Sequence, residues 1–296
     1  MNKVTRLKYY IESLCIYDFE DDDVFSALYD LLCDDEEDTV ALQSYFFKEL
    51  AKSESLKRHI SRLILTNDNI FTKAACAGKV NELSIAVINA VKSDLAKLEE
   101  IASLTAQDIL ADIDDEDIKE ILLTLPGWEV GKPLAPLDSH WDRQLDELIK
   151  YHRENGYGIY AKNIAFTWRD EEITPVNSID PIRLTDLKNY ELQRNKVIDN
   201  TESFIAGHPA NNVLLYGDRG TGKSSTVHAI LNEYWQKGLR MIEIPKSAVA
   251  DLSLIREQIA DSPMKFIIYI DDLSFDSNDT SFSELKAALE GSLSGK

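Results

Sequence analysis

The stretch LLYGDRGTGKSS, Leu214 to Ser225, decides the fold that we expect for the second half of this 296-residue chain. Residues 217–224 fit the pattern GxxxxGK[ST] at every fixed position. A short apolar strand is expected before them, over 212–216, and a helical pattern follows. Glycines let the backbone curl around phosphate oxygens, and the N–H groups at a helix N-terminus attract anions. The stretch therefore predicts a phosphate-binding loop.

Each residue of this loop has an expected part in binding a nucleotide. Lys223 would reach the β- and γ-phosphates, Ser224 would ligate Mg²⁺, and Ser225 would bond the α-phosphate. Arg219 has two expected roles, contact with a phosphate or a neighbouring subunit, or plain exposure to solvent. The rest of the predicted binding loop is Gly217, Asp218, Gly220, Thr221 and Gly222.

A second motif, FIIYIDDL at 266–273, supplies the carboxylates that a metal-dependent site needs. Its apolar run predicts a buried strand, and open α/β sheets bind ligands at the carboxyl ends of their strands. Asp271 is expected to hold Mg²⁺ and Asp272 to polarise the attacking water. The alternative for both is a structural carboxylate.

Residues 181–296 alternate between helical and strand patterns, which predicts a parallel sheet with crossover helices. Just before them, Ile164–Trp168 and Ile173–Val176 alternate around a polar turn and predict a β-hairpin whose aromatic side chains pack on a neighbouring domain. The expected strands are 212–216, 240–245 and 265–273, and the expected helices are 184–207, 224–238, 253–262 and 282–293.

Residues 1–155 read as helices throughout. The apolar spacing predicts helices over 4–15, 42–50, 56–65 and 83–98, with Asn81 as the N-cap of the last, then one that ends before Pro126 and one over 139–155 that Gly156 stops. We therefore expect an all-α domain over 1–155, a hairpin linker over 156–180 and an α/β nucleotide-binding domain over 181–296.

The composition and net charge limit the kinds of partner that we expect. The net charge of −20 and the sequence pI of about 4.6 argue against nucleic acid and anionic membranes. The acidic runs 20–23 and 34–38 lack the ligand spacing and the glycine of a calcium loop and predict solvated loops or helix N-termini. Cys15, Cys33 and Cys76 are expected to be buried free thiols. Neither a signal peptide nor a membrane span is evident, so we expect a cytoplasmic protein.

At these motifs the chain resembles the AAA+ ATPases. Segments such as GYGIYAKNIAFTW, ANNVLLYGDRGTGKSSTVHAILNEY and FIIYIDDLSFD are similar to an uncharacterised bacterial ATP-binding family with a domain of unknown function. The resemblance implies a P-loop NTPase fold, ATP and Mg²⁺ as ligands, a homo-oligomeric ring such as a hexamer, and ATP hydrolysis that remodels an unknown protein client. It also implies that Leu187 and Tyr190 approach the adenine.

The resemblance covers residues from about 150 onward, and parts of the AAA+ pattern do not follow the second motif. A strand with a polar sensor, an arginine finger and a helical lid would come after it, so we expect a fragment of a longer protein with weak hydrolysis by itself. Three alternatives stay open: an ATP-binding regulatory module with little hydrolysis, a small-molecule or nucleotide kinase, and a helical scaffold. In a kinase the strands before the loop and before Asp271 would pair directly.

Overall fold

The computed structural model describes the whole chain except residues 35–36, 54, 261, 272 and 274–296. The chain divides into two compact units, Met1–Arg153 and Glu154–Lys296. The first is helical, and the second combines helices with a sheet.

The first unit is built from helices around one apolar core, as the spacing predicted. The core holds large buried side chains such as Phe46, Phe71 and Trp141. The elements are α1 (Lys3–Glu12), α2 (Asp23–Cys33), α3 (Thr39–Leu50), α4 (Leu56–Leu65), α5 (Ile70–Ala77), η1 (Val80–Glu82), α6 (Ile85–Ile101), α7 (Ala106–Leu110), α8 (Glu116–Leu122) and η2 (Trp141–Arg143), followed by α9 (Leu145–Asn155), which crosses the boundary between the units.

Helix ends in this unit follow local capping chemistry. The expected acidic run 20–23 places Asp22 at the N-cap of α2, where its side chain accepts a hydrogen bond from Phe25 N. The N-cap expected at Asn81 was wrong, because a 3₁₀ turn occupies Val80–Glu82 and the Ser84 hydroxyl caps α6 instead. Gly156 follows α9 with φ +85°, a backbone conformation that favours glycine.

Buried polar groups join distant segments of the first unit. Asp94 on α6 is fully buried, and its Oδ2 accepts hydrogen bonds from the backbone N–H groups of Cys15, Ile16 and Tyr17 at 2.9, 2.7 and 3.3 Å. His59 on α4 lies between Asp22, 2.8 Å from Nε2, and Ser53, 2.8 Å from Nδ1. These contacts lock loops onto helices that the sequence separates by many residues.

Two of the three cysteines differ from the expectation of buried thiols. Cys76 is buried, but Cys33 is only half-buried and Cys15 is exposed. Cys15 follows the end of α1 instead of lying on its apolar face, so its side chain leaves the core. All three are free thiols.

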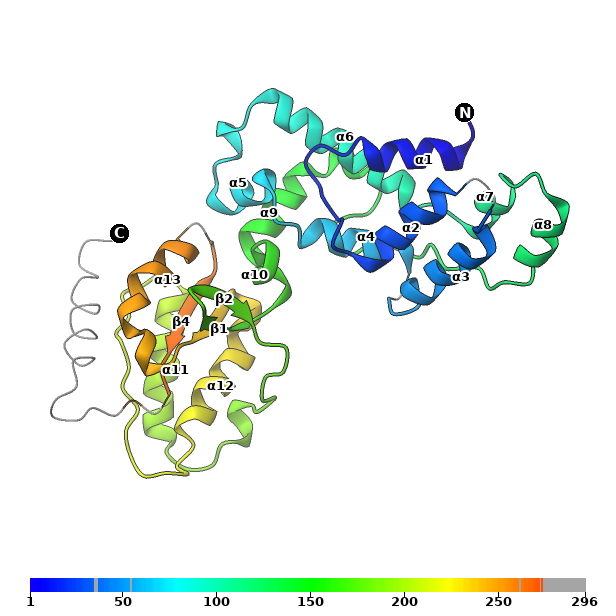
Figure 1. Cartoon of the computed structure of the whole chain (residues 1–296). Helices are drawn as coiled ribbons and strands as arrows, with labels where there is room; N and C mark the ends of the chain where they lie inside the picture. Colours follow the sequence, from blue (N-terminus) through cyan, green and yellow to red (C-terminus); the bar gives the residue numbers. More distant parts are fainter. Residues whose placement is uncertain (35–36, 54, 261, 272, 274–296) are drawn as a thin grey trace. The chain divides into compact units, whose positions relative to one another are not determined.

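The second unit is a mixed sheet with helices on both faces (Figure 1). The strand order is β2-β1-β3-β4; β1 pairs antiparallel with β2 and parallel with β3, and β3 pairs parallel with β4. The elements are α10 (Gly158–Lys162), β1 (Ala165–Arg169), β2 (Glu172–Pro175), η3 (Leu184–Asp186), α11 (Glu191–Ile205), α12 (Lys223–Tyr234), η4 (Trp235–Lys237), β3 (Leu239–Glu243), η5 (Lys246–Asp251), α13 (Leu252–Ile259) and β4 (Lys265–Tyr269).

Alternation along the strands creates two apolar layers. Ile242 of β3 and Ile268 of β4 face one layer, which includes α13, whereas Met241 and Ile267 face the other, which includes α11 and α12. The three-layer arrangement follows from this alternation, because each face of the sheet must be covered.

The predicted hairpin forms, with Asp170 and Glu171 at its turn, both at positive φ. It is not a separate linker, because β1 is an interior strand that pairs with β3. For the same reason Phe166 and Trp168 are buried against α13 of their own unit and not against another domain.

Candidate functional site

The strand expected before the phosphate loop does not form. Residues 212–216 have no partner strand in the described part of the chain, and β4 pairs there with β3 alone. Val213, Leu214 and Tyr216 are 49, 71 and 89% exposed. An apolar run becomes a strand only where a neighbour takes up its N–H and C=O groups, and the prediction from local pattern did not include that requirement.

The glycine-rich loop has the open backbone that the motif requires. Gly217, Gly220 and Gly222 have φ values of 143°, 80° and 81°, which residues with a Cβ rarely adopt. A Cβ at Gly220 or Gly222 would meet nothing within 4 Å, so the space beside the loop is clear. Within the described residues, the N–H groups of Gly220, Thr221 and Gly222 donate no hydrogen bond.

Helix α12 begins at Lys223 without a side-chain cap. The first N–H groups of a helix lack partners inside the helix, and the aligned peptide dipoles give this end a partial positive charge. The loop and the start of α12 together therefore present a row of unsatisfied donors that an anion can accept.

The ammonium of Lys223 folds back over the loop. Its Nζ donates to the carbonyl oxygens of Gly217 and Asp218 at 2.9 and 2.8 Å, and Thr221 Oγ1 donates to the same Asp218 carbonyl at 2.9 Å. These bonds hold the one cationic side chain of the GK[ST] segment at the loop, where it neutralises carbonyl dipoles. An anion bound in the loop can accept hydrogen bonds from this ammonium in place of the two neutral carbonyl oxygens.

Ser224 and Asp271 meet across the two predicted motifs. The Ser224 hydroxyl lies 3.2 Å from each oxygen of the Asp271 carboxylate. Ser224 is in the first turn of α12 and Asp271 comes two residues after β4, so the contact joins the loop to the carboxyl end of the sheet. Alternation explains it, since Tyr269 faces the α12 layer and Asp271 follows on the same side.

Tyr269 is a member of this cluster that the motifs did not single out. Burial raises the pKa of Tyr269 to about 12; the hydrogen bond and charge of Asp271 add to the rise, and a hydrogen bond with Ser224 opposes it. The phenol therefore keeps its proton at neutral pH. The ring of His228, one turn after Ser224, packs edge-on against Tyr269 with centroids 6.1 Å apart. The sequence could have indicated Tyr269, because it precedes Asp271 by two positions and side chains two apart on a strand lie on the same face.

The remaining predicted site residues differ in how far they are exposed. Ser225 is half-buried in the first turn of α12, and Arg219 is exposed. Leu187 is half-buried and Tyr190 is 54% exposed; Arg194 of α11 donates to the Leu187 carbonyl, so this segment is held by α11. Asp272, the predicted water-activating acid, and the helix expected over 282–293 lie outside the described residues.

The donor set fits a phosphate chain with a hard cation. Unsatisfied N–H groups and an ammonium suit phosphate oxygens, and a hydroxyl beside a carboxylate suits Mg²⁺, which prefers oxygen ligands and keeps several waters. Elsewhere in the described part of the chain, no group of three or more His, Cys, Asp or Glu side chains could hold a metal ion.

Comparison with known proteins gives a family match for the second unit. The family model described as "Protein of unknown function (DUF815)" matches residues 161–296, a little under half of the chain, and this span contains both motifs. No curated protein and no solved structure matches the chain. Among the described helices, none combines the length and the apolar character needed to cross a membrane.

Proposed function

We propose that the second unit binds ATP with Mg²⁺ and hydrolyses it as an AAA+ type P-loop NTPase. The observation that carries the proposal is the contact between Ser224 and Asp271, because it brings a hydroxyl and a carboxylate together beside a loop of unsatisfied N–H groups. This combination is the one that a nucleotide's phosphates and their cation require.

In the proposed complex each residue of the loop contacts a different part of the nucleotide and its cation. The N–H groups of Gly220, Thr221 and Gly222 bind phosphate oxygens, and Lys223 leaves its two carbonyl partners to neutralise the β- and γ-phosphates. Ser224 and Asp271 would hold the cation, and Mg²⁺ would supply positive charge that stabilises the transferred phosphate. The Tyr269 hydroxyl donates a hydrogen bond to the carboxylate of Asp271 and fixes its orientation.

Hydrolysis needs a group that orients the attacking water, and we propose Asp272 for it. The segment that contains Leu187 and Tyr190 would lie against the base. We further propose a homo-oligomeric ring that remodels a protein client in the cytoplasm; light scattering of the chain with and without ATP tests the assembly.

The metal part of the proposal is tested by the effect of Mg²⁺ on binding of a fluorescent ATP analogue. Mg²⁺ should tighten binding by roughly tenfold in the wild type, which is about 1.4 kcal/mol. Ser224→Ala and Asp271→Asn should each remove this enhancement and retain binding in EDTA. Ser253→Ala, which changes an exposed serine on α13, is the matched control. Equal Mg²⁺ enhancement in all four proteins would exclude a cation site at Ser224 and Asp271.

Release of phosphate separates hydrolysis from the alternatives. Steady production of ADP and inorganic phosphate, lost in Asp272→Asn, is the expected result. Binding without turnover would favour a regulatory module, and ADP formed only when a small-molecule acceptor is added would favour a kinase.

A further inference from the structure

A groove between α3 and α8 in the first unit has the lining of a peptide-binding surface. It encloses about 410 Å³, within the range of roughly 300–1,000 Å³ typical of ligand clefts. The residues around it are Glu37, Asp38, Thr39, Val40, Ala41, Ser44, Ile118 and Leu125. We call this surface the α3–α8 groove.

The floor of the α3–α8 groove is apolar. Val40, Ala41, Ile118 and Leu125 line it, and none of the four is buried. Two more apolar side chains are exposed nearby, Ile121 on α8 and Leu123 just after it, at 50 and 65%. Apolar side chains of a partner would remove this area from water.

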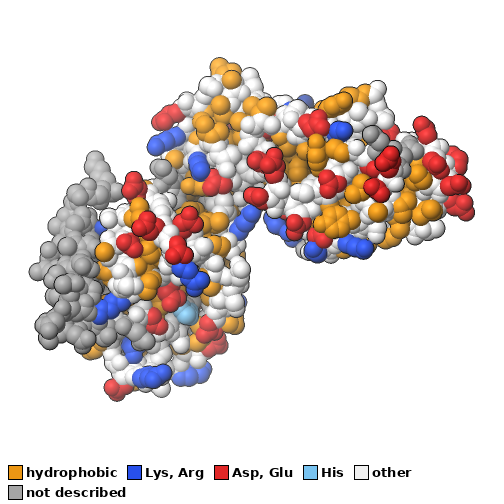
Figure 2. All heavy atoms as spheres, in the orientation of Figure 1, with side chains coloured by type: hydrophobic (Ala, Val, Ile, Leu, Met, Phe, Trp, Pro, Cys, Tyr) orange, Lys and Arg blue, Asp and Glu red, His pale blue; other side chains and the backbone are white. Residues whose placement is uncertain are grey.

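The rim and the neighbouring helix are acidic. Glu37 and Asp38 are exposed at the groove. Six of the nine residues from 112 to 120 are acidic and only Lys119 is basic. Figure 2 shows carboxylates beside apolar side chains at the end of the unit where Figure 1 labels α8. A field of this sign repels nucleic acid and attracts lysine and arginine.

A buried acceptor without a donor lies in a smaller cavity beside the α3–α8 groove. Gln43 on α3 is only 2% exposed, and its Oε1 has no hydrogen-bond partner among the described residues. It lines a cavity of about 70 Å³ that adjoins the α3–α8 groove at Leu125. A buried carbonyl of this kind is costly unless an N–H group reaches it.

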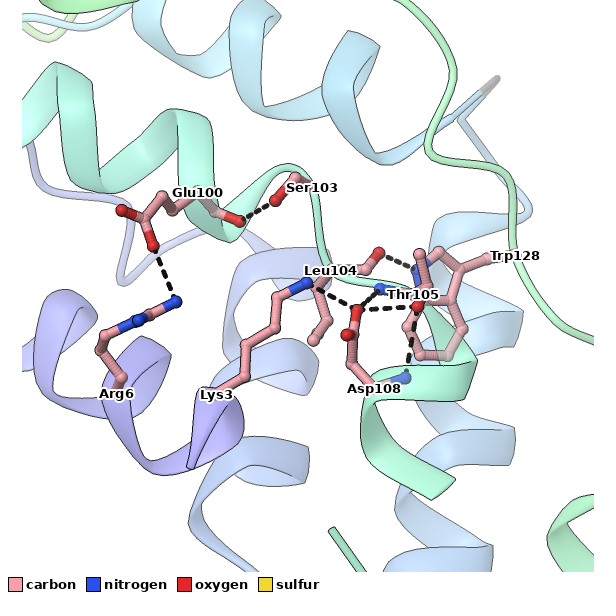
Figure 3. A network of polar contacts seen from close by, with 8 residues as sticks. All are labelled: Lys3, Arg6, Glu100, Ser103, Leu104, Thr105, Asp108 and Trp128. Carbon is pink, nitrogen blue, oxygen red and sulfur yellow. Dashed lines mark hydrogen bonds and ion pairs between the residues drawn. The ribbon is translucent and has the colours of Figure 1, made fainter. Parts of the chain in front are cut away.

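A polar network, which Figure 3 shows, surrounds the start of α7, whose residues Ala106 and Gln107 line that cavity. Asp108 accepts hydrogen bonds from the Thr105 N–H and hydroxyl at 2.8 and 2.7 Å and from Lys3 at 2.7 Å. Trp128 donates from Nε1 to the Leu104 carbonyl at 2.9 Å, and its ring packs edge-on against Phe46 of α3. These contacts join α1, α3 and α7 beside the cavity.

We propose that the α3–α8 groove binds a basic amphipathic segment of a partner protein, with leucine-like side chains on the groove floor and lysine or arginine against Glu37 and Asp38. This mode is a helix-in-groove or short-peptide interaction, recognised through apolar anchors with flanking cations. The inference concerns the first unit and does not depend on nucleotide binding.

The test uses the full chain and a fluorescein-labelled synthetic helix of leucine and lysine, followed by anisotropy. Two further peptides replace every lysine by glutamate or every leucine by serine. Only the leucine–lysine peptide should bind tightly. Ala41→Trp, which fills the groove from an exposed position, should weaken it at least tenfold, and the double change Glu37→Gln with Asp38→Asn should weaken it by roughly fivefold at low salt.

Matched controls separate a site from general attraction. Ala86→Trp places the same side chain at an exposed alanine of α6, and the pair Glu20→Gln with Asp21→Asn neutralises another exposed acidic pair. Both should leave the affinity unchanged. Because the double acidic variant changes only exposed side chains, its result stands even if Ala41→Trp disturbs folding, which circular dichroism reports.

Several results would overturn the proposal. They are equal binding of the leucine–lysine peptide to Ala41→Trp and Ala86→Trp, equal binding of the serine peptide, equal binding of the glutamate peptide, and no binding at all. Self-association of the chain that Ala41→Trp abolishes would assign the groove to a second copy and would also overturn it.

Discussion

Removal of the Asp94 carboxylate should destabilise the first unit strongly, and more than removal of the half-buried carboxylate of Glu99 on the same helix. Asp94 is 0% exposed and accepts three backbone N–H groups from the segment that follows α1. Its other oxygen lies 3.7 Å from the Lys97 ammonium. In Asp94→Ala these three N–H groups lose their acceptor on α6.

The magnitude follows from the burial of the three donors. Tyr17 is buried, so its N–H would be left unsatisfied, which costs about 1–3 kcal/mol. Ile16 is half-buried and Cys15 exposed, so water replaces part of those bonds. We expect a loss of about 3 kcal/mol in the free energy of unfolding. Asp94→Asn keeps an acceptor oxygen and removes a buried charge, so its loss should be about half as large.

Hydrogen–deuterium exchange by mass spectrometry reads this effect in each unit separately. A loss of about 3 kcal/mol accelerates exchange of the protected amides of α1 and α6 by roughly 150-fold. Peptides from the second unit should not change. Glu99→Ala is the graded control, because Glu99 is half-buried and accepts only two N–H groups, from His140 and Trp141. Acceleration below tenfold in Asp94→Ala, or an equal effect of Glu99→Ala, would refute the reasoning.

Three further results are expected. Burial would raise the pKa of Asp108, but hydrogen bonds from Lys3 and Thr105 lower it below the ordinary value of 3.8. Asp108→Asn should therefore reduce the free energy of unfolding by about 1 kcal/mol at pH 7, and by progressively less as the pH falls through the lowered pKa. A difference in urea unfolding that does not change with pH would contradict this. Glu171→Gly should stabilise the hairpin by about 0.5–1 kcal/mol in thermal unfolding, because Glu171 has φ 61°; a lower melting temperature would contradict this. Cys15 should react quickly with a thiol reagent and Cys76 only on unfolding, because burial raises the Cys76 pKa to about 12; equal rates would contradict this.

Much of the architecture could be predicted from local pattern. The helix predicted over 56–65 has those bounds in the structure, β4 lies within its predicted strand, and β3 overlaps its predicted strand but begins one residue earlier. Ser224 and Asp271, which the motifs predict as ligands of one Mg²⁺ ion, lie within hydrogen-bond distance of each other. For the helix and the strands, the periodicity of apolar residues carries the information, because it fixes which face is buried.

The failures arise where the outcome depends on distant partners. Residues 212–216 have strand composition, but pairing is a property of the neighbouring strands. Cys15 reads as part of an apolar helix, yet α1 ends at Glu12 and the following N–H groups bond to Asp94 instead. Likewise nothing local indicates that His59 meets Asp22 or that Gln43 lines a cavity.

Binding of a fluorescent ATP analogue by the wild type and by Lys223→Ala is the most direct test of a nucleotide site in the second unit. Lys196→Ala, at an exposed lysine of α11, is the matched control. We predict saturable binding in the presence of Mg²⁺ that Lys196→Ala retains and Lys223→Ala weakens by roughly 10- to 100-fold, as loss of charge-assisted bonds to phosphate implies. A well-folded wild type that binds no nucleotide, or equal affinities of the two lysine variants, would contradict it.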